Sequence, residues 1–172
     1  MVKYTLPCFV FLLFLAGCAS GGWRVIDAEE FTVEFPGQPI DTVTGDMENA
    51  GTRLYYEPVE AGIDSNVYYA VSVYNLPDSA EILGDLLESI MMKDAEIYAW
   101  SMGAIVVDSG KVVKSNTVEG REYKVFLGQN AGVVTMRKFG KGLHLYTLLV
   151  VTGNYALDNT QIYHFLDSFR LK

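Results

Sequence analysis

The sequence is poor in the side chains that build catalytic and metal sites. Its 172 residues include only two cysteines and two histidines. It contains no His-Glu-x-x-His motif, no Cys-x-x-Cys motif and no glycine-rich phosphate loop between a strand and a helix. We therefore expect no metal, no cofactor and no catalytic residue, and the protein is not predicted to be an enzyme.

Positive charge is also scarce. The chain has 13 basic and 21 acidic residues and a net charge of −8. This balance argues against nucleic acid as a partner, because binding to nucleic acid depends on neutralising its phosphates. Charged residues make up only 20% of the chain and half of the residues are hydrophobic, which excludes a disordered chain. The length and composition are typical of one globular domain with a sizeable core.

The one marked apolar run lies at the N-terminus, from Cys8 to Ala16, after the positive charge of Lys3. It is less than half as long as a transmembrane helix, which needs about 20 apolar residues, so it predicts the core of a signal peptide. The run ends in Leu-Ala-Gly before Cys18. This ending resembles the lipobox of bacterial lipoproteins, whose cysteine is lipidated and becomes the first mature residue. The alternative is an ordinary signal peptide that happens to end near Cys18.

The lipobox interpretation predicts the organisation of the whole chain. We expect a signal peptide over residues 1–17, a lipidated cysteine with a short tether over 18–25, and a single domain over 26–172. Membrane lipid would then be one partner, through the acylated Cys18. The expected location is the cell envelope. The absence of aspartate at position 19 favours the periplasmic side of the outer membrane if the organism has two membranes.

Short strand patterns separated by turn residues dominate the rest of the sequence. Residues 143–151 are apolar on both faces, which predicts a central strand that is covered on both sides. The other expected strands, from alternating or mostly apolar patterns, are residues 31–35, 40–47, 52–56, 67–76, 111–117, 121–127 and 133–137.

Two segments instead have helical spacing. The first begins with a capping box at residues 78–81 and should extend at least to Lys93, with Trp100 as the alternative end and Gly103 as a stop. The second begins with a capping box at residues 158–161. Together these patterns predict an α+β fold, one antiparallel sheet with helices packed on it. The side chains of the second helix that should face the core are Ile162, Phe165 and Phe169.

The order of these elements resembles that of bacterial domains with a PsbP-like fold. The resemblance covers the chain from about residue 26 to its end and implies an α/β/α sandwich. It also implies a non-catalytic binding or assembly factor, since the family includes an extrinsic subunit of photosystem II. The sequence departs from the family pattern at Glu119 and at His144, and it has no motif that would carry over metal or photosystem contacts. The matching phrases are residues 31–39 (FTVEFPGQP), 118–123 (VEGREY), Arg137 with 143–150, and 165–171 (FLDSFRL).

Several polar groups suggest chemistry but lack the required spacing. His164, Asp167 and Ser168 share one helical turn, which is not the geometry of a catalytic triad, so we interpret them as a solvated helix face. His144 is interpreted as a structural histidine. A third group, the acidic residues Asp41, Asp46 and Glu48, does not match a calcium-binding loop and is interpreted as surface charge.

Arg137, Lys138 and Lys141 lie together at the end of a predicted hairpin. They are the candidate contact for a protein partner or for anionic lipid headgroups. The alternative is a hairpin tip whose charges only interact with water.

Five tyrosines lie on two predicted strands and have two possible roles. The sequence favours packing in the core, and the alternative is an interface with a partner. They are Tyr55, Tyr56, Tyr68, Tyr69 and Tyr74.

Two hypotheses for function follow, besides an enzyme of unfamiliar type. The first is a membrane-anchored envelope lipoprotein that binds or scaffolds an envelope protein without catalysis. The alternative is a carrier or sensor of a small ligand, with a pocket between sheet and helix that is lined by tyrosines.

Overall fold

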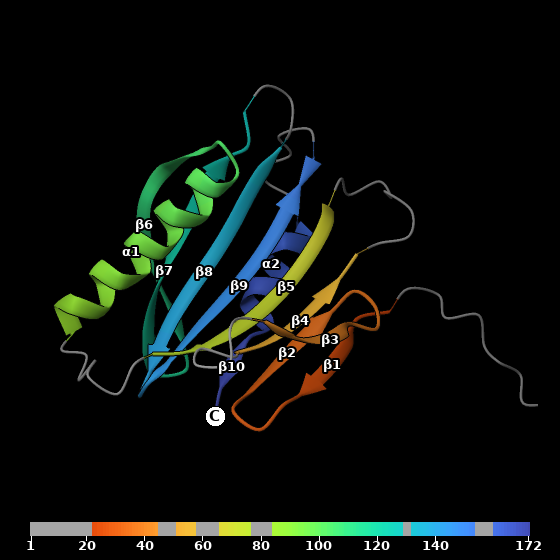
Figure 1. The fold of residues 1–172 in the computed structure, drawn as a ribbon. Helices are drawn as coiled ribbons and strands as arrows, with labels where there is room; N and C mark the ends of the chain where they lie inside the picture. Colours follow the sequence, from red (N-terminus) through yellow and green to blue (C-terminus); the bar gives the residue numbers. More distant parts are fainter. Residues whose placement is uncertain (1–21, 45–50, 58–65, 77–83, 129–131, 154–159) are drawn as a thin grey trace, which may run out of the picture.

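A computed structural model describes residues 22–44, 51–57, 66–76, 84–128, 132–153 and 160–172. In these residues two helices and a small sheet cover the two faces of a larger sheet (Figure 1). The helices are α1 (Gly84–Ser101) and α2 (Thr160–Ser168). The strands are β1 (Arg24–Asp27), β2 (Phe31–Phe35), β3 (Ile40–Thr44), β4 (Gly51–Tyr56), β5 (Asn66–Asn75), β6 (Ile105–Ser115), β7 (Val118–Phe126), β8 (Val133–Lys141), β9 (His144–Thr152) and β10 (Arg170–Leu171).

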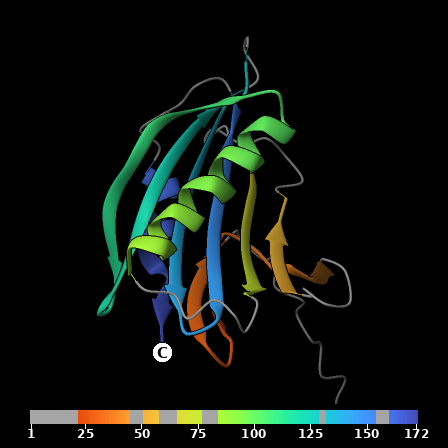
Figure 2. The same ribbon diagram turned by 60° about the vertical axis from the view of Figure 1, so that its left-hand side comes forward.

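The large sheet has the strand order β3-β4-β5-β9-β8-β7-β6, and every described pair is antiparallel. The small sheet, β1-β2-β10, packs on one face of it together with α2. Helix α1 lies across the other face (Figure 2). The result is an α+β sandwich in which the middle strands β8 and β9 have a packed layer on each side.

The alternation of side chains along β9 explains why its sequence is apolar throughout. Tyr146 and Leu148 point into the layer of α2, whereas Leu145 and Leu149 point into the layer of α1. Both sets are buried. The prediction of a central strand that is covered on both sides is therefore confirmed.

Aromatic side chains hold α2 against the sheet. Phe165 lies edge-on to Phe35 of β2, with ring centroids 5.1 Å apart, and edge-on to Tyr69 of β5 at 5.4 Å. Phe169, just after the helix, stacks on Phe139 at 5.5 Å. The predicted core positions of this helix, Ile162, Phe165 and Phe169, are all buried.

Helix α1 makes a different kind of layer. Its buried side chains are short or flexible, namely Met91, Ala95 and Ala99, and they pack on residues such as Tyr123 of β7. The helix ends at Ser101, before Gly103, whose φ of 65° is left-handed and suits a residue without a side chain. This end agrees with the predicted stop. In the described residues no helix is long and apolar enough to cross a membrane.

Some expectations about the sheet need correction. The described residues form two sheets rather than the one that was predicted. The prediction missed β1 and β10, which pair with β2 in the small sheet. Strand β1 is mostly exposed and β10 has two residues, so neither carries a clear apolar alternation. The first half of β6 was also missed, since register shifts between Val106 and Lys111 interrupt its alternation. The capping box at residues 78–81, and residues 158 and 159 of the second box, lie outside the described residues.

Candidate functional site

The three basic residues of the β8–β9 hairpin do not form a common surface. Arg137 and Lys138 are neighbours on β8, so their side chains point to opposite faces of the sheet. Arg137 is 7% exposed and Lys138 is 1% exposed. Only Lys141 is exposed, and its Nζ donates to the carbonyl oxygen of Lys172. The predicted basic contact is therefore wrong for Arg137 and Lys138, because both are buried in ion pairs.

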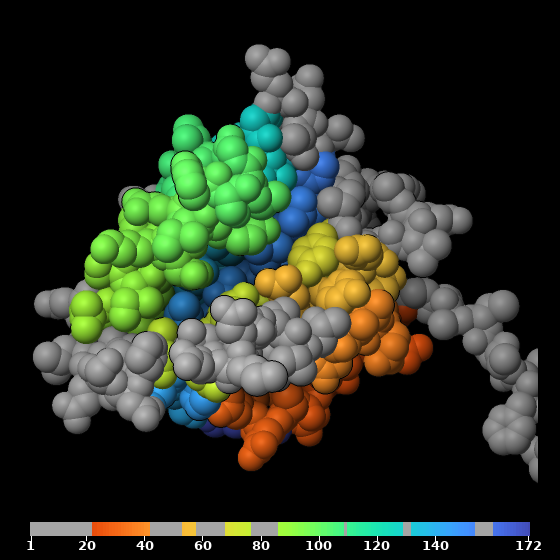
Figure 3. All heavy atoms as spheres, in the orientation of Figure 1, coloured from red at the N-terminus to blue at the C-terminus, as the bar shows by residue number. Residues whose placement is uncertain are grey.

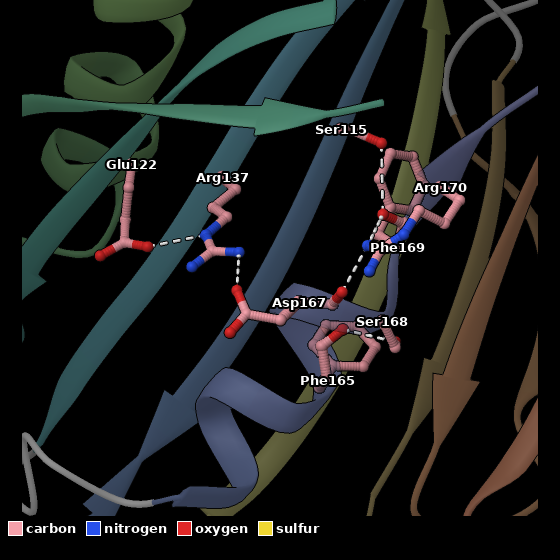
Figure 4. Close-up of polar contacts among 8 residues, drawn as sticks. All are labelled: Ser115, Glu122, Arg137, Phe165, Asp167, Ser168, Phe169 and Arg170. Carbon is pink, nitrogen blue, oxygen red and sulfur yellow. Dashed lines mark hydrogen bonds and ion pairs between the residues drawn. The ribbon is translucent and has the colours of Figure 1, made fainter. Parts of the chain in front are cut away.

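Arg137 is paired with carboxylates in the layer of α2. Its Nε lies 2.7 Å from Oε2 of Glu122 on β7, and its Nη1 lies 2.6 Å from Oδ1 of Asp167 on α2 (Figure 4). Glu122 is as buried as Arg137, so the guanidinium is compensated where it sits. This pairing links β7, β8 and α2 and has a structural role.

Lys138 makes the equivalent contact in the layer of α1. Its Nζ donates to Oδ2 of Asp94 on α1 and, at 3.1 Å, to Oγ1 of Thr147 on β9. Burial lowers the pKa of Lys138, and the charge and hydrogen bond of Asp94 oppose this effect. Unlike Arg137, Lys138 borders an open space.

That space is a cavity of about 330 Å³ between α1 and the sheet, at the small end of the range of ligand sites. Figure 3 shows the hollow between α1 and the strands β4 and β5, with atoms of β8 and β9 at its bottom. Its lining combines polar and apolar side chains: Arg53, Tyr68, Ala70, Ser72, Tyr74, Asp94, Ile97, Tyr98, Ser101, Met136, Lys138, Thr147 and Leu149.

A row of four polar residues crosses the floor of the cavity. Arg53 of β4 pairs with Ser72 of β5, Ser72 pairs with Thr147 of β9, and Thr147 pairs with Lys138 of β8. Residues that are paired across neighbouring strands share a face of the sheet, so all four point into the layer of α1. We call these four residues the polar row.

Hydroxyl groups hold the guanidinium of Arg53. Its Nε donates to Oγ of Ser72 and its Nη2 donates to the hydroxyl of Tyr74, each at 3.2 Å. Burial acts to lower the pKa of Arg53, but the interactions with Tyr74, Tyr68 and Tyr98 outweigh it and raise the pKa. Burial also raises the pKa values of the Tyr68 and Tyr98 phenols, which stay neutral at neutral pH and can donate hydrogen bonds.

The cavity presents fixed cations and hydroxyl groups beside apolar surface. This combination is suited to binding a small molecule. Among the described residues that line the cavity there is neither histidine nor cysteine. Among the described residues, no group of three or more histidine, cysteine, aspartate or glutamate side chains could hold a metal ion.

The other polar candidates from the sequence lie apart from this cavity. His164 stacks on Trp23, with ring centroids 3.9 Å apart, and its Nε2 lies 2.7 Å from Oε2 of Glu34. Asp167 pairs with Arg137, while Oγ of Ser168 donates to the carbonyl oxygen of Phe165 (Figure 4). These side chains do not form a catalytic triad.

His144 and the acidic group are also outside the cavity. Nε2 of His144 lies 3.5 Å from Oε1 of Glu30, and its buried Nδ1 has no hydrogen-bond partner among the described residues. Asp41 is exposed, whereas Asp46 and Glu48 lie outside the described residues, as does Cys18.

The tyrosines divide between the two roles that the sequence left open. Tyr69 is buried in the core, in the layer of α2. Tyr68 and Tyr74, on the other face of the same strand, line the cavity. Tyr55 stacks on Tyr68, with ring centroids 5.9 Å apart, and supports it from β4. Core packing, which the sequence favoured, therefore describes only part of the group.

Sequence reasoning missed Arg53, Asp94 and Tyr98. No motif marks them, since they come from a short strand and from a helix whose carboxylates resemble an ordinary solvated face. One signal was available. A lysine in the middle of an apolar central strand requires a buried counter-charge, and this requirement points to a carboxylate on the helix that covers it.

The ion pair between Lys138 and Asp94 can be tested by stability. Asp94→Asn should lower the free energy of unfolding by about 1–3 kcal/mol, because it leaves a buried ammonium without its carboxylate. Lys138→Met should lower the free energy of unfolding by less, since the Asp94 side chain is 43% exposed and water can solvate it. In the Lys138→Met background, Asp94→Asn should have almost no effect. Urea unfolding at pH 7 measures all four proteins, and an equal cost in both backgrounds would contradict the assignment.

Comparisons with known proteins agree with the architecture. No protein-family model and no curated protein matches the chain by sequence. Among solved structures, the chain is similar to cyanobacterial PsbP (CyanoP) from Synechocystis sp. PCC 6803, with a TM-score of 0.59 and 13% sequence identity. The alignment covers 91% of this chain and 96% of that one. At this identity the likeness concerns the fold alone, and on that ground the chain has a PsbP-like fold.

Proposed function

We propose that this protein is a membrane-tethered, non-catalytic accessory protein that carries or senses a small molecule. The observation that supports this function best is the cavity between α1 and the sheet, with the polar row across its floor. The hairpin expected to contact a protein partner does not present a basic surface, because two of its three basic side chains are buried. The ligand-carrier alternative thus becomes the preferred one.

Two features of the domain support a binding role for the cavity. Hydrogen bonds hold the cations at its floor, so a ligand meets groups that are already in place. The chain also enters the domain in the opposite layer, where Trp23 packs on Tyr69 and His164. Trp23 therefore lies on the face of the large sheet opposite the cavity.

Filling the cavity should prevent binding of the natural ligand. Ala70 is buried and lines the cavity, so Ala70→Leu places three more carbon atoms there. We expect native mass spectrometry of the gently purified wild-type protein to show a bound mass that the Ala70→Leu variant lacks.

The matched control is Ala28→Leu. Ala28 lines a separate opening in the layer of β1 and β2, so the same exchange there should leave the bound mass in place. Loss of the ligand only in Ala28→Leu, or a wild-type protein without any bound mass, would contradict the proposed function.

The tether forms the second part of the proposal. Acylation of Cys18 would keep the domain at the membrane surface, and Cys18→Ser should move the protein from the membrane fraction to the soluble fraction. Metabolic labelling with an alkyne analogue of palmitate measures the acylation directly, with Cys8→Ser as the matched control. Equal labelling of wild type and Cys18→Ser would overturn the lipoprotein assignment.

A second candidate function is docking of an envelope protein. The end of α1 and the start of β6 expose a group of large apolar side chains, which is a feature of interaction surfaces. We call this group the apolar strip. It consists of Ile97, Trp100, Met102, Ile105 and Val107.

Matched serine substitutions test the apolar strip. Ile105 and Val25 are 68% and 67% exposed, and each lies on an edge of its sheet. Ile105→Ser should reduce the yield of a crosslinked partner about tenfold, the effect of losing one anchor side chain. Val25→Ser should leave the yield unchanged. Crosslinking in cells followed by quantitative mass spectrometry provides the measurement, and equal yields in both variants would exclude the strip as the docking site.

A further inference from the structure

We propose that the ligand of the cavity is an uncharged organic molecule whose carbonyl oxygen is bound between the hydroxyl groups of Ser72 and Thr147. This inference rests on the proposed function and specifies the chemical class of the ligand. It depends on how the charges of the lining are used, on the protons of the two hydroxyl groups and on the apolar residues beside them.

The charged side chains of the described lining are already engaged. Lys138 and Asp94 form an ion pair, in which the two charges cancel. Arg53 donates to Ser72 and Tyr74 and takes part in a further interaction as well. A charged ligand would therefore lose its hydration without gaining a counter-charge that is reserved for it, and this loss costs free energy. An uncharged ligand avoids the cost.

The two hydroxyl groups keep their protons for a ligand. Oγ of Ser72 accepts a hydrogen bond from Nε of Arg53, and Oγ1 of Thr147 accepts one from Nζ of Lys138. A hydroxyl group is also a donor, and no contact among the described residues uses the proton of either group. A hydroxyl group that accepts from a cation is polarised and donates more strongly. The floor of the cavity therefore presents two strong donors that carry no charge.

One carbonyl oxygen can accept from both hydroxyl groups. Ser72 and Thr147 are direct partners across β5 and β9, and the Cβ atoms of such a pair are about 5 Å apart. A carbonyl oxygen has two lone pairs. With hydrogen bonds of about 2.8 Å, it can join two hydroxyl oxygens that are up to about 5.6 Å apart. Ser72 and Thr147 are only 5% and 8% exposed, so little water competes for their protons.

The neighbouring cross-strand pair on the same face is apolar. Ala70 pairs with Leu149, and Leu149 pairs with Met136 of β8. These three side chains line the cavity about 7 Å from the polar row, the length of two residues along a strand. A molecule whose carbonyl group lies on the polar row can place an apolar body over them and gains from the area that it buries. We therefore expect a ketone, an amide or an ester with an aromatic or aliphatic body.

Three probes that share one naphthalene body separate the carbonyl group from charge and from apolar contact. They are 6-acetyl-2-(dimethylamino)naphthalene and its 6-ethyl and 6-carboxylate analogues. We expect the wild-type protein to bind the acetyl probe about tenfold more tightly than the carboxylate probe, which has the same shape but a charge to desolvate. Fluorescence titration of the full chain in detergent measures the affinities. Ala70→Leu should weaken the acetyl and ethyl probes, and it also measures the probe that the micelles take up.

Thr147→Val keeps the shape of the side chain and removes its hydroxyl group. It should weaken the acetyl probe about fivefold, the effect of one lost hydrogen bond, and leave the ethyl probe unchanged. The emission of the bound acetyl probe should move to shorter wavelength, because a hydrogen bond to its carbonyl group shifts emission to longer wavelength. A damaged cavity would admit water and shift the emission in the opposite direction. Thr147→Ser retains a hydroxyl group and should restore the binding.

The matched control is Thr135→Val. Thr135 is buried on β8 and shares a face with Arg137, in the layer of α2. The same exchange at this position should change neither the affinity nor the emission of any probe.

The outcomes distinguish the two levels of the proposal. If Thr147→Val weakens the acetyl and ethyl probes equally, or if the carboxylate probe binds as tightly as the acetyl probe, the carbonyl assignment is wrong while the cavity keeps its binding role. If no probe binds the wild-type protein above the level of Ala70→Leu, the proposed function itself is overturned. Selective loss of the acetyl probe in Thr147→Val, with recovery in Thr147→Ser, supports both.

Discussion

Burial of β8 and β9 on both faces is the constraint on which the rest of the structure depends. A charge on such a strand cannot reach water, and leaving it without a partner would cost several kcal/mol. Arg137 and Lys138 nevertheless stand side by side on β8. Because neighbouring residues on a strand point to opposite faces, each takes a carboxylate from the helix that covers its own face, Asp167 of α2 or Asp94 of α1. One pair of residues thus fixes both helices to the sheet.

The two layers satisfy this constraint in different ways. On the α2 side, aromatic rings fill the layer, and Arg137 is held between the carboxylates of Glu122 and Asp167. On the α1 side, the helix packs on β6, β7 and β8 through short side chains such as Ala95 and Ala99. The part of the face that β9, β5 and β4 form extends beyond the helix. Lys138 lies at the boundary between the covered and the open part, and the cavity begins there.

This difference also explains what could be predicted from the sequence. The apolar run of β9 predicts a two-sided central strand, and the spacing of Ile162, Phe165 and Phe169 predicts the buried face of α2; both patterns are local and both predictions are confirmed. Arg137, Lys138 and Lys141 were grouped because they are close in the chain, although alternation places the first two on opposite faces. The cavity depends on the register of four strands far apart in the sequence, so no short motif could reveal the polar row.

The position of the cavity also separates the proposed binding surface from the aromatic packing of the fold. Residues that the fold needs, such as Phe165 and Arg137, lie in the layer of α2, where Trp23 brings in the chain from its N-terminal segment. The residues of the two proposed binding surfaces lie in the other layer, at the end of α1 and over β4 and β5. A fold shared at 13% identity can keep the first layer's packing while the second layer changes its side chains. The polar row and the apolar strip are therefore the features of this chain, rather than of its architecture, on which the proposed functions depend.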